Sequence, residues 1–251
     1  MDVPTPTDAR LQAARGLLAA AQRVCVLTGA GVSAESGVPT FRGAGGLWRD
    51  HDPMSLATPE AFSRDPVLVW DFYNWRRTLI TKVQPNPAHH AIVRLEARAP
   101  HFTLVTQNVD GLHRRAGNQH IIELHGDIWS TRCLSCGDVV LDHGPDRVDL
   151  GPAPACQTCG GLLRPNVVWF GENLDPHRWQ AAVEACATCQ VLLVVGTSAT
   201  VQPAASLALL AKERGATVIE VNLEPTAHSD FLNVTLLGKA GEILPRLVPD
   251  V

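Results

Sequence analysis

Short apolar runs alternate along the chain with stretches in which apolar residues recur every three or four positions. Such runs, bounded by turn residues, are typical of buried parallel strands. The expected strands are residues 24–28, 102–106, 121–126, 164–172, 191–195 and 218–221. The helical spacing predicts helices over residues 8–22, 59–62, 66–80, 89–96, 176–187, 204–214 and 241–247. The alternation predicts an α/β fold with a doubly wound parallel, Rossmann-like sheet.

Length and charge narrow the class of protein. The 251 residues suffice for one large α/β domain with a small appendage. A net charge of -4 gives no basic field for nucleic acid, and neither an apolar run of roughly 18 residues nor a secretory signal is present. We therefore expect a cytoplasmic monomer that binds neither membranes nor nucleic acid directly.

Four of the seven cysteines form two matched C-x-x-C pairs, which nineteen residues (137–155) separate. This spacing is typical of a tetrahedral four-cysteine zinc ribbon, and a site with no open coordination position is structural. Cys186 and Cys189 repeat the spacing without a second pair, so we expect them to be buried as small apolar side chains. The predicted zinc ligands are Cys133, Cys136, Cys156 and Cys159.

Two segments interrupt the strand and helix alternation. Residues 43–84 read as a mostly helical insertion and residues 129–165 as the zinc ribbon, and together they predict a small domain. The main domain is then built from residues 1–42, 85–128 and 166–251.

A glycine turn follows the first expected strand. Gly29, Gly31 and Ala34 match the G-x-G-x-x-[GA] pattern, in which close backbone approach lets N–H groups face a phosphate. No second strand ending in an acidic residue follows about 20 residues on, which argues against an ordinary dehydrogenase. A plain tight turn is the alternative.

Polar residues follow other expected strands. Asn108 and Asp110 come after residues 102–106, and His125 closes the run at 121–126. Because ligands bind outside the carboxyl ends of parallel strands, we expect these side chains at the same rim as Gly29. The alternatives are that Asn108 and Asp110 only cap a helix and that His125 is an ordinary hydrogen-bonded histidine. His89 and His90 are expected on a helix surface.

The motifs of the chain resemble those of the sirtuin family, NAD-dependent protein lysine deacylases. Residues 29–42 match the family signature GAG(I/V)SxxSGxPxFR. Thr-Gln-Asn-Val-Asp-Gly, Leu-His-Gly, the cysteine pairs, Val-Trp-Phe-Gly-Glu, Gly-Thr-Ser and Asn-Leu-Glu follow in family order over nearly the whole chain. The resemblance implies that an acyl-lysine oxygen cleaves the nicotinamide–ribose bond of NAD, giving nicotinamide, lysine and O-acyl-ADP-ribose.

The resemblance also implies roles for residues. His125 would be the general base, Asn108 would orient the ribose, and Asp110 would hold the nicotinamide carboxamide. The implied NAD-binding set, with NAD as co-substrate and one structural Zn²⁺, is Gly29, Ala30, Gly31, Ser33, Ala34, Glu35, Thr40, Phe41, Arg42, Trp48, Gln107, Asn108, Val109, Asp110, His125, Gly196, Thr197, Ser198, Asn222, Leu223, Glu224 and Ala240.

Substrate recognition is implied at two places. Val168, Trp169, Phe170, Gly171 and Glu172 would accept the acylated peptide as an added strand.

Tyr73 and Arg76 lie three apart on an expected helix, and they resemble the pair of the sirtuin subgroup that removes succinyl, malonyl or glutaryl groups. Acetyl-lysine would also be accepted. The alternative is an aromatic core residue beside a solvated arginine.

Two other functions remain open from the sequence. Mono-ADP-ribosyl transfer would use the same cleavage of NAD with another acceptor. A non-catalytic NAD- or ADP-ribose-sensing module with a zinc ribbon for a partner protein needs no general base, so His125 argues against it. Nucleic-acid binding is disfavoured because residues 129–165 carry three arginines against four aspartates.

Overall fold

The computed structural model describes residues 7–40, 53–141 and 149–250, and its main element is a six-stranded parallel sheet. The strand order is β3-β2-β1-β7-β8-β9, so the chain leaves β1 in one direction for β2 and β3 and later in the other for β7 to β9. This confirms the doubly wound sheet. The strands are β1 (Arg23–Thr28), β2 (His101–Thr106), β3 (Ile121–Glu123), β7 (Val191–Val195), β8 (Thr217–Asn222) and β9 (Val234–Leu237).

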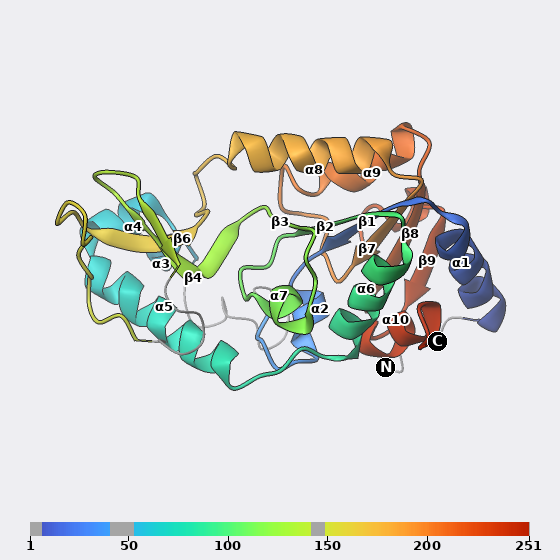
Figure 1. Ribbon diagram of the computed structural model, residues 1–251, viewed down its shortest axis with the longest axis horizontal. Coiled ribbons are helices and arrows are strands. Elements are labelled where there is room, and N and C mark those ends of the chain that lie inside the picture. Colours follow the sequence, from blue (N-terminus) through green and yellow to red (C-terminus); the bar gives the residue numbers. More distant parts are fainter. Residues whose placement is uncertain (1–6, 41–52, 142–148, 251) are drawn as a thin grey trace.

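Helices cover both faces of this sheet (Figure 1). Side chains alternate along each strand, so Leu193 of β7 packs in one core and Leu192 in the other. One face is covered by α1 (Asp8–Ala20), α6 (Pro87–Arg98) and α10 (Ala240–Leu247), and the other by α8 (Pro176–Thr188) and α9 (Ser206–Glu213). Short helices α2 (Gly31–Ala34) and α7 (Leu112–Ala116) follow the carboxyl ends of β1 and β2.

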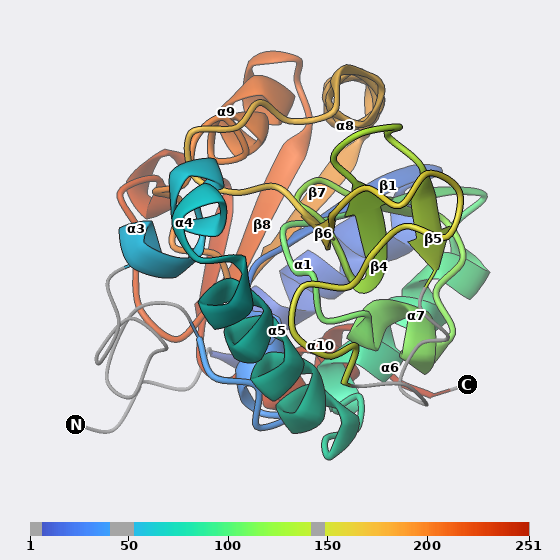
Figure 2. The ribbon, with the colours of Figure 1, turned by 90° about the vertical axis from the view of Figure 1, so that its left-hand side faces the viewer.

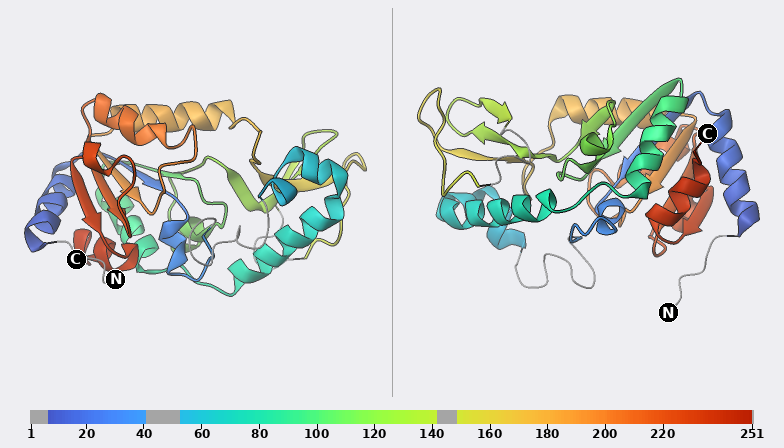
Figure 3. Two further views of the ribbon diagram at one scale, coloured as in Figure 1. Left: turned by 180° about the vertical axis from the view of Figure 1, so that it is seen from behind. Right: turned by 60° about the horizontal axis from the view of Figure 1, so that its bottom comes forward.

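A small lobe projects from one end of the main sheet, as the two views of Figure 3 show. Its antiparallel sheet has the order β5-β4-β6, and helices from the other insertion pack beside it. Seen from this end in Figure 2, α4, α5 and the small sheet lie in front of the main sheet. The elements are α3 (Pro53–Leu56), α4 (Pro59–Arg64), α5 (Pro66–Thr81), β4 (Gly126–Cys133), β5 (Val139–Leu141) and β6 (Leu163–Val167).

Helix starts in the small lobe follow their sequence signals. The Thr58 side chain accepts a hydrogen bond from the Ala61 N–H, and Asp65 accepts one from Leu68, with proline at the first turn of each helix. These caps set where α5 begins, and therefore which of its side chains face the small sheet.

Three expectations about elements need correction. The expected strand 164–172 ends at Val167 and pairs with β4, so it belongs to the small sheet. The expected strand 121–126 ends at Glu123, which leaves His125 in the connection to β4. The edge strand β9 was not expected, because it is short and pairs only with β8. In the described ranges, no helix is long and apolar enough to cross a lipid bilayer.

Candidate functional site

The glycine turn packs directly on the residue that follows β7. The Gly29 N–H donates to the Val195 carbonyl at 3.1 Å, and the Gly31 N–H donates to Gly196 at 2.8 Å. A Cβ on Gly31 would lie 2.7 Å from the Gly196 Cα, so this contact requires glycine. Two of the N–H groups of the turn that was expected to face a phosphate, those of Gly29 and Gly31, therefore already have backbone acceptors.

Asn108 and Asp110 meet Ser33 beneath this turn, and all three side chains are buried. The Asn108 amide donates both hydrogens, to the Gly29 carbonyl at 3.1 Å and to Ser33 Oγ at 3.2 Å. The Ser33 hydroxyl donates to Asp110 Oδ2 at 2.8 Å. The group that Asn108 can still offer is its Oδ1, a hydrogen-bond acceptor.

Asp110 is a buried acid with fixed partners. Its Oδ1 accepts the Leu112 N–H at 2.9 Å, at the first residue of α7, whose N-cap position is Gly111. Burial raises the pKa of Asp110, while the bonds from Leu112 and Ser33 lower it in part. Its carbonyl accepts the Trp129 indole N–H at 2.8 Å, which ties this residue to the small lobe.

His89 lies inside the protein, which corrects its expected place on a helix surface; His90 is exposed. The Asn86 N–H donates to His89 Nδ1 at 3.2 Å, so the neutral ring carries its proton on Nε2, 3.5 Å from Ser33 Oγ. The ring packs on that of His113 with centroids 4.8 Å apart. Burial lowers the pKa of His89 to about 2 and that of His113 to about 4, so both stay neutral.

His125 is held by a backbone carbonyl. Its Nδ1 lies 3.0 Å from the Gln107 oxygen, and because a carbonyl only accepts, Nδ1 carries the proton. Nε2 of the neutral ring is then the proton acceptor. Burial lowers the pKa of His125, although the bond to Gln107 raises it in part. The ring is therefore a neutral base at neutral pH.

The residues expected at the adenosine end come together after β7 and β8. Asn222 Nδ2 donates to the Thr197 carbonyl at 2.8 Å, and Gln107 Nε2 donates to Thr197 Oγ1 at 3.2 Å. Glu35 Oε1 accepts the Gly241 N–H at 2.8 Å, beside Ala240. Ser198, Leu223 and Glu224 are exposed in the same region.

Three residues of the expected NAD set, Phe41, Arg42 and Trp48, lie outside the described residues. Thr40, at the end of the described turn, is half-buried, as are Ala30 and Ala34. Val109 is buried, and its carbonyl accepts the Ile128 N–H at 3.0 Å.

Tyr73 and Arg76 are both buried, so the alternative of a solvated arginine does not hold. The guanidinium carbon of Arg76 lies 5.8 Å from the centre of the Tyr73 ring. Burial lowers the pKa of Arg76, while the neighbouring Tyr73 and the carboxylate of Asp110 raise it in part.

The connection after β6 is tied down by its own backbone. The N–H groups of Val168 and Phe170 donate to the carbonyls of His125 and Ala57 at 2.8 and 2.9 Å. Trp169 donates its N–H to the Glu172 carboxylate at 2.8 Å, and Gly171 has a φ of 84°. The N–H groups of Val168, Trp169 and Phe170 are therefore already bonded, and an added peptide strand would pair with other backbone groups of this segment.

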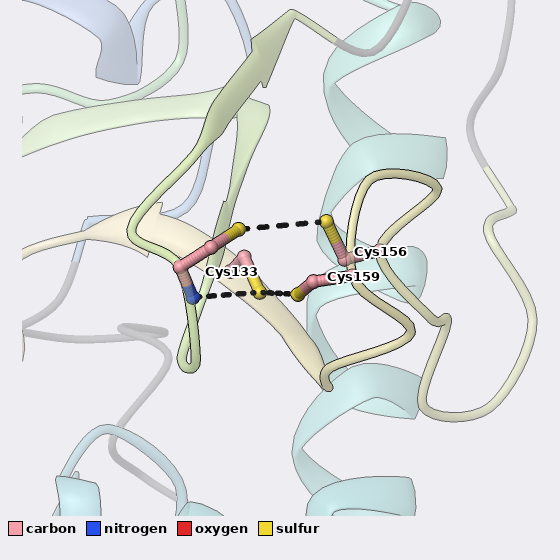
Figure 4. A group of neighbouring side chains, drawn as sticks. Cys133, Cys156 and Cys159 are labelled. Atoms are coloured by element: carbon pink, nitrogen blue, oxygen red, sulfur yellow. Dashed lines mark hydrogen bonds between the residues drawn. The ribbon is translucent and has the colours of Figure 1, made fainter.

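The four predicted zinc ligands gather in one cluster, with all four sulfur atoms within 4.8 Å of one another. The Cys133 and Cys159 sulfurs are 3.5 Å apart, and those of Cys136 and Cys156 are 3.8 Å apart. Figure 4 shows the labelled sulfurs facing one another from two turns. Zn–S bonds of about 2.3 Å in a tetrahedron place sulfurs about 3.8 Å apart, so the cluster fits zinc and is far too wide for disulfides.

Comparison with known proteins shows the family of this chain. A model described as the Sir2 family matches residues 29–203. The chain belongs to the Sir2 family. NAD-dependent protein deacylase 2 of Pyrobaculum aerophilum is 55% identical over 236 residues, covering 94% of this chain and 93% of that protein. NAD-dependent protein deacylase 1 of Pseudomonas aeruginosa is 50% identical over 239 residues, covering 92% and 95%.

Solved structures of the Sir2 family show the same fold. A Sir2 homologue in complex with NAD has a TM-score of 0.88 at 44% identity, with 99% of this chain and 95% of that chain covered. A Sir2 complex with a p53 peptide and NAD has a TM-score of 0.82 at 30% identity, with 92% and 94% covered.

Sequence reasoning missed one side chain of the site, Arg164. It is fully buried, donates to both oxygens of Glu172 at 2.5 and 2.9 Å, and lies over the Trp169 ring at 3.4 Å. From the sequence alone, Arg164 is only one of three arginines in residues 129–165. The only sequence feature that could have indicated the contact is the carboxylate of Glu172, eight residues after Arg164. Spacing alone does not show that the chain turns back between Arg164 and Glu172.

Proposed function

We propose that the protein is an NAD-dependent protein lysine deacylase that transfers the acyl group of lysine to ADP-ribose and releases nicotinamide. The observation that carries this proposal is the neutral base at His125. Its Nδ1 is fixed by the Gln107 carbonyl at 3.0 Å, and Gln107 adjoins Asn108 at the carboxyl end of β2. Membership of the Sir2 family and the names of its relatives support the same activity.

The chain's own residues would divide the work as follows. Asn108 would accept a hydrogen bond from a ribose hydroxyl through Oδ1, because both hydrogens of its amide are already donated. The Asp110 carboxylate, with the Val109 backbone, would hold the nicotinamide carboxamide. His125 would take a proton from a ribose hydroxyl through Nε2, a role that typically contributes about 10²–10⁴-fold in rate.

The remaining residues would position the co-substrate and the peptide. Thr197, held by Gln107 and Asn222, would face the adenosine half of NAD. Backbone groups of residues 168–172 would pair with the acylated peptide as an added strand. The four cysteines would hold one structural zinc that keeps the β4 and β6 ends together and takes no part in the chemistry.

The acyl preference is the finer part of the proposal. Tyr73 and Arg76 are buried side by side, and a buried guanidinium favours a partner with negative charge. A succinyl or malonyl group ends in such a carboxylate, whereas an acetyl group does not. We therefore propose that the enzyme prefers succinyl- and malonyl-lysine and also accepts acetyl-lysine.

The wider setting follows the same proposal. We propose that the enzyme works as a monomer in the cytoplasm, and that residues 43–84 and 129–165 form the small domain beside the NAD-binding domain. The seven cysteines, all unpaired, suit a reducing compartment.

The test is NAD-dependent removal of succinyl and acetyl groups from one lysine peptide, followed by mass spectrometry. We expect the His125→Ala variant to lose about 10²–10⁴-fold in activity, and the exposed His90→Ala control to lose none. Because His125 must be neutral and burial lowers its pKa, the acid limb of the activity profile should lie below pH ~6.5. Arg76→Met should lower desuccinylation more than deacetylation.

The products separate the alternatives. O-acyl-ADP-ribose supports deacylation, whereas ADP-ribose attached to protein would instead indicate ADP-ribosyl transfer. If the zinc-loaded enzyme binds NAD but removes neither acyl group and modifies no protein, the sensing function takes its place.

A further inference from the structure

The Tyr73 hydroxyl has a defined hydrogen-bond direction. The indole Nε1–H of Trp169 donates to it at 2.8 Å, and an indole nitrogen has no other role than donor. Burial raises the pKa of Tyr73, so the phenol keeps its proton. In the part of the chain that the structure describes, no acceptor takes that proton. Tyr73 is thus left as a donor to whatever enters beside it.

Two contacts hold Trp169 in place. Its backbone N–H donates to the Glu172 carboxylate at 2.8 Å, and the guanidinium of Arg164 stacks on its ring, 3.4 Å from the ring centroid. Arg164 in turn donates to both Glu172 oxygens and to the Val167 carbonyl at 2.7 Å. Although burial raises the pKa of Glu172, the bonds from Arg164 and Trp169 lower it overall, so the carboxylate stays charged.

Arg76 supplies a second donor on the same side of α5. Its guanidinium carbon lies 5.7 Å from the Phe72 ring and 5.8 Å from the Tyr73 ring. The Trp169 ring lies near the same rings, with its centroid 6.5 Å from that of Tyr73 and 5.2 Å from that of Phe62. A carboxylate beside Arg76 could therefore accept both from the guanidinium and from the Tyr73 hydroxyl.

We propose that Trp169, held by the Arg164 and Glu172 pair, is a positioning residue that turns the Tyr73 hydroxyl into a donor for the distal carboxylate of the acyl group. Trp169 then favours dicarboxylic acyl groups through Tyr73, in addition to its backbone's part in holding the peptide. The inference rests on the proposed function, of which it explains the acyl preference.

The experiment is a double-mutant cycle on peptide binding, measured by calorimetry without NAD on the zinc-loaded protein. Succinyl-lysine and acetyl-lysine versions of one peptide are compared for wild type, Trp169→Phe, Tyr73→Phe and the double variant. We expect Trp169→Phe to reduce the succinyl-to-acetyl affinity ratio about five- to tenfold, the size of one oriented hydrogen bond. In the Tyr73→Phe background the same substitution should leave the ratio unchanged.

Trp70→Phe is the matched control. Trp70 is a buried tryptophan of α5 whose indole N–H donates to the Leu163 carbonyl at 3.0 Å, so its loss removes one indole donor from the same cluster without touching Tyr73. The affinity ratio should stay at the wild-type value in this variant even if its stability falls.

Equal reductions by Trp169→Phe in both backgrounds, or none in either, would overturn the inference, as would a wild type that binds the two peptides equally. Failure of the proposed function would give a different result from failure of this inference. In that case neither acyl group is removed when NAD is added, while the difference between the backgrounds persists in the calorimetry.

Discussion

Single buried side chains at the site have their hydrogen-bond directions set by backbone partners that can only donate or only accept. The Asn86 N–H makes His89 Nδ1 an acceptor, and the Gln107 carbonyl makes His125 Nδ1 a donor. The two neutral histidines therefore carry their protons on opposite ring nitrogens. This difference leaves His125 a base, while His89 supports Ser33 and, through it, Asp110.

The buried histidines should make stability depend on pH. Burial lowers the pKa of His89 to about 2 and of His113 to about 4, against about 6.5 in the unfolded chain. Below pH ~6.5 the unfolded chain therefore binds protons that the native state does not. Stability should fall toward pH ~4 by up to about 1.4 kcal/mol per pH unit for each histidine.

The measurement is urea unfolding at pH 7 and pH 5. The difference between the two pH values should be smaller in His113→Asn than in wild type, while the exposed His90→Asn variant should keep the wild-type difference. An unchanged pH dependence in His113→Asn would contradict the assignment of this histidine as buried and neutral.

At the scale of elements, the two turns that carry the cysteine pairs, 133–136 and 156–159, join β4 to the segment before β6. Cys133 ends β4, and the Cys156 N–H donates to the Gly161 carbonyl at 2.7 Å in the opposite turn. We expect one zinc per chain by elemental analysis, and Cys136→Ser should lose it because a structural site needs all four ligands.

Cys189→Ser offers a control with the same C-x-x-C spacing. Cys189 is buried against α8, where Cys186 lies 3.8 Å from Cys25, and burial raises the pKa of Cys189 to about 12. Its removal should leave the zinc content at one. Loss of zinc in this variant would place a ligand outside the four-cysteine cluster.

The glycine turn allows a paired test of close approach. In Gly31→Ala the new methyl would meet Gly196, so the two loops must separate and stability and NAD binding should both fall. Gly16 in α1 has nothing within 4 Å of its Cβ position, and Gly16→Ala should raise stability by about 0.5–1 kcal/mol. Thermal unfolding measures the stability of both variants, and NAD titration measures their NAD affinity. If Gly31→Ala changed neither quantity, the close contact between Gly31 and Gly196 would be refuted.

At the scale of the whole molecule, the small lobe has its own core, shared by two distant parts of the chain. Phe62 and Trp70 from the helical insertion pack with Ile128 and Val167 of the small sheet. The zinc cluster lies at the far end of the same sheet. Loss of zinc should therefore loosen the helices of the insertion as well as the ribbon.

Hydrogen exchange with and without a zinc chelator tests this coupling. We expect faster exchange in α4, α5, β4 and β6, because they share one core, and unchanged exchange in β1, β7 and β8, which lie in the two cores of the main sheet. Exchange that rises in the ribbon alone would show that the insertion is stable by itself.

Much of this arrangement was predictable because the signals are local. Apolar runs predicted the central strands, the helical spacing that begins at Pro66 predicted α5, and the cysteine spacing predicted the metal cluster. The strands β6 and β9 were misplaced or missed, because which sheet a short strand joins depends on its partner and not on its own residues.

The sequence by itself determined the central strands, the main helices, the four zinc ligands and the polar residues that follow β1 and β2, since periodicity and spacing act within short segments. Only the tertiary structure decided that His89 is buried, that the Gly29 and Gly31 amides are already bonded, and that Arg164 reaches Glu172 and Trp169. The physical reason is that hydrogen-bond partners and burial are set by contacts between segments far apart in the chain.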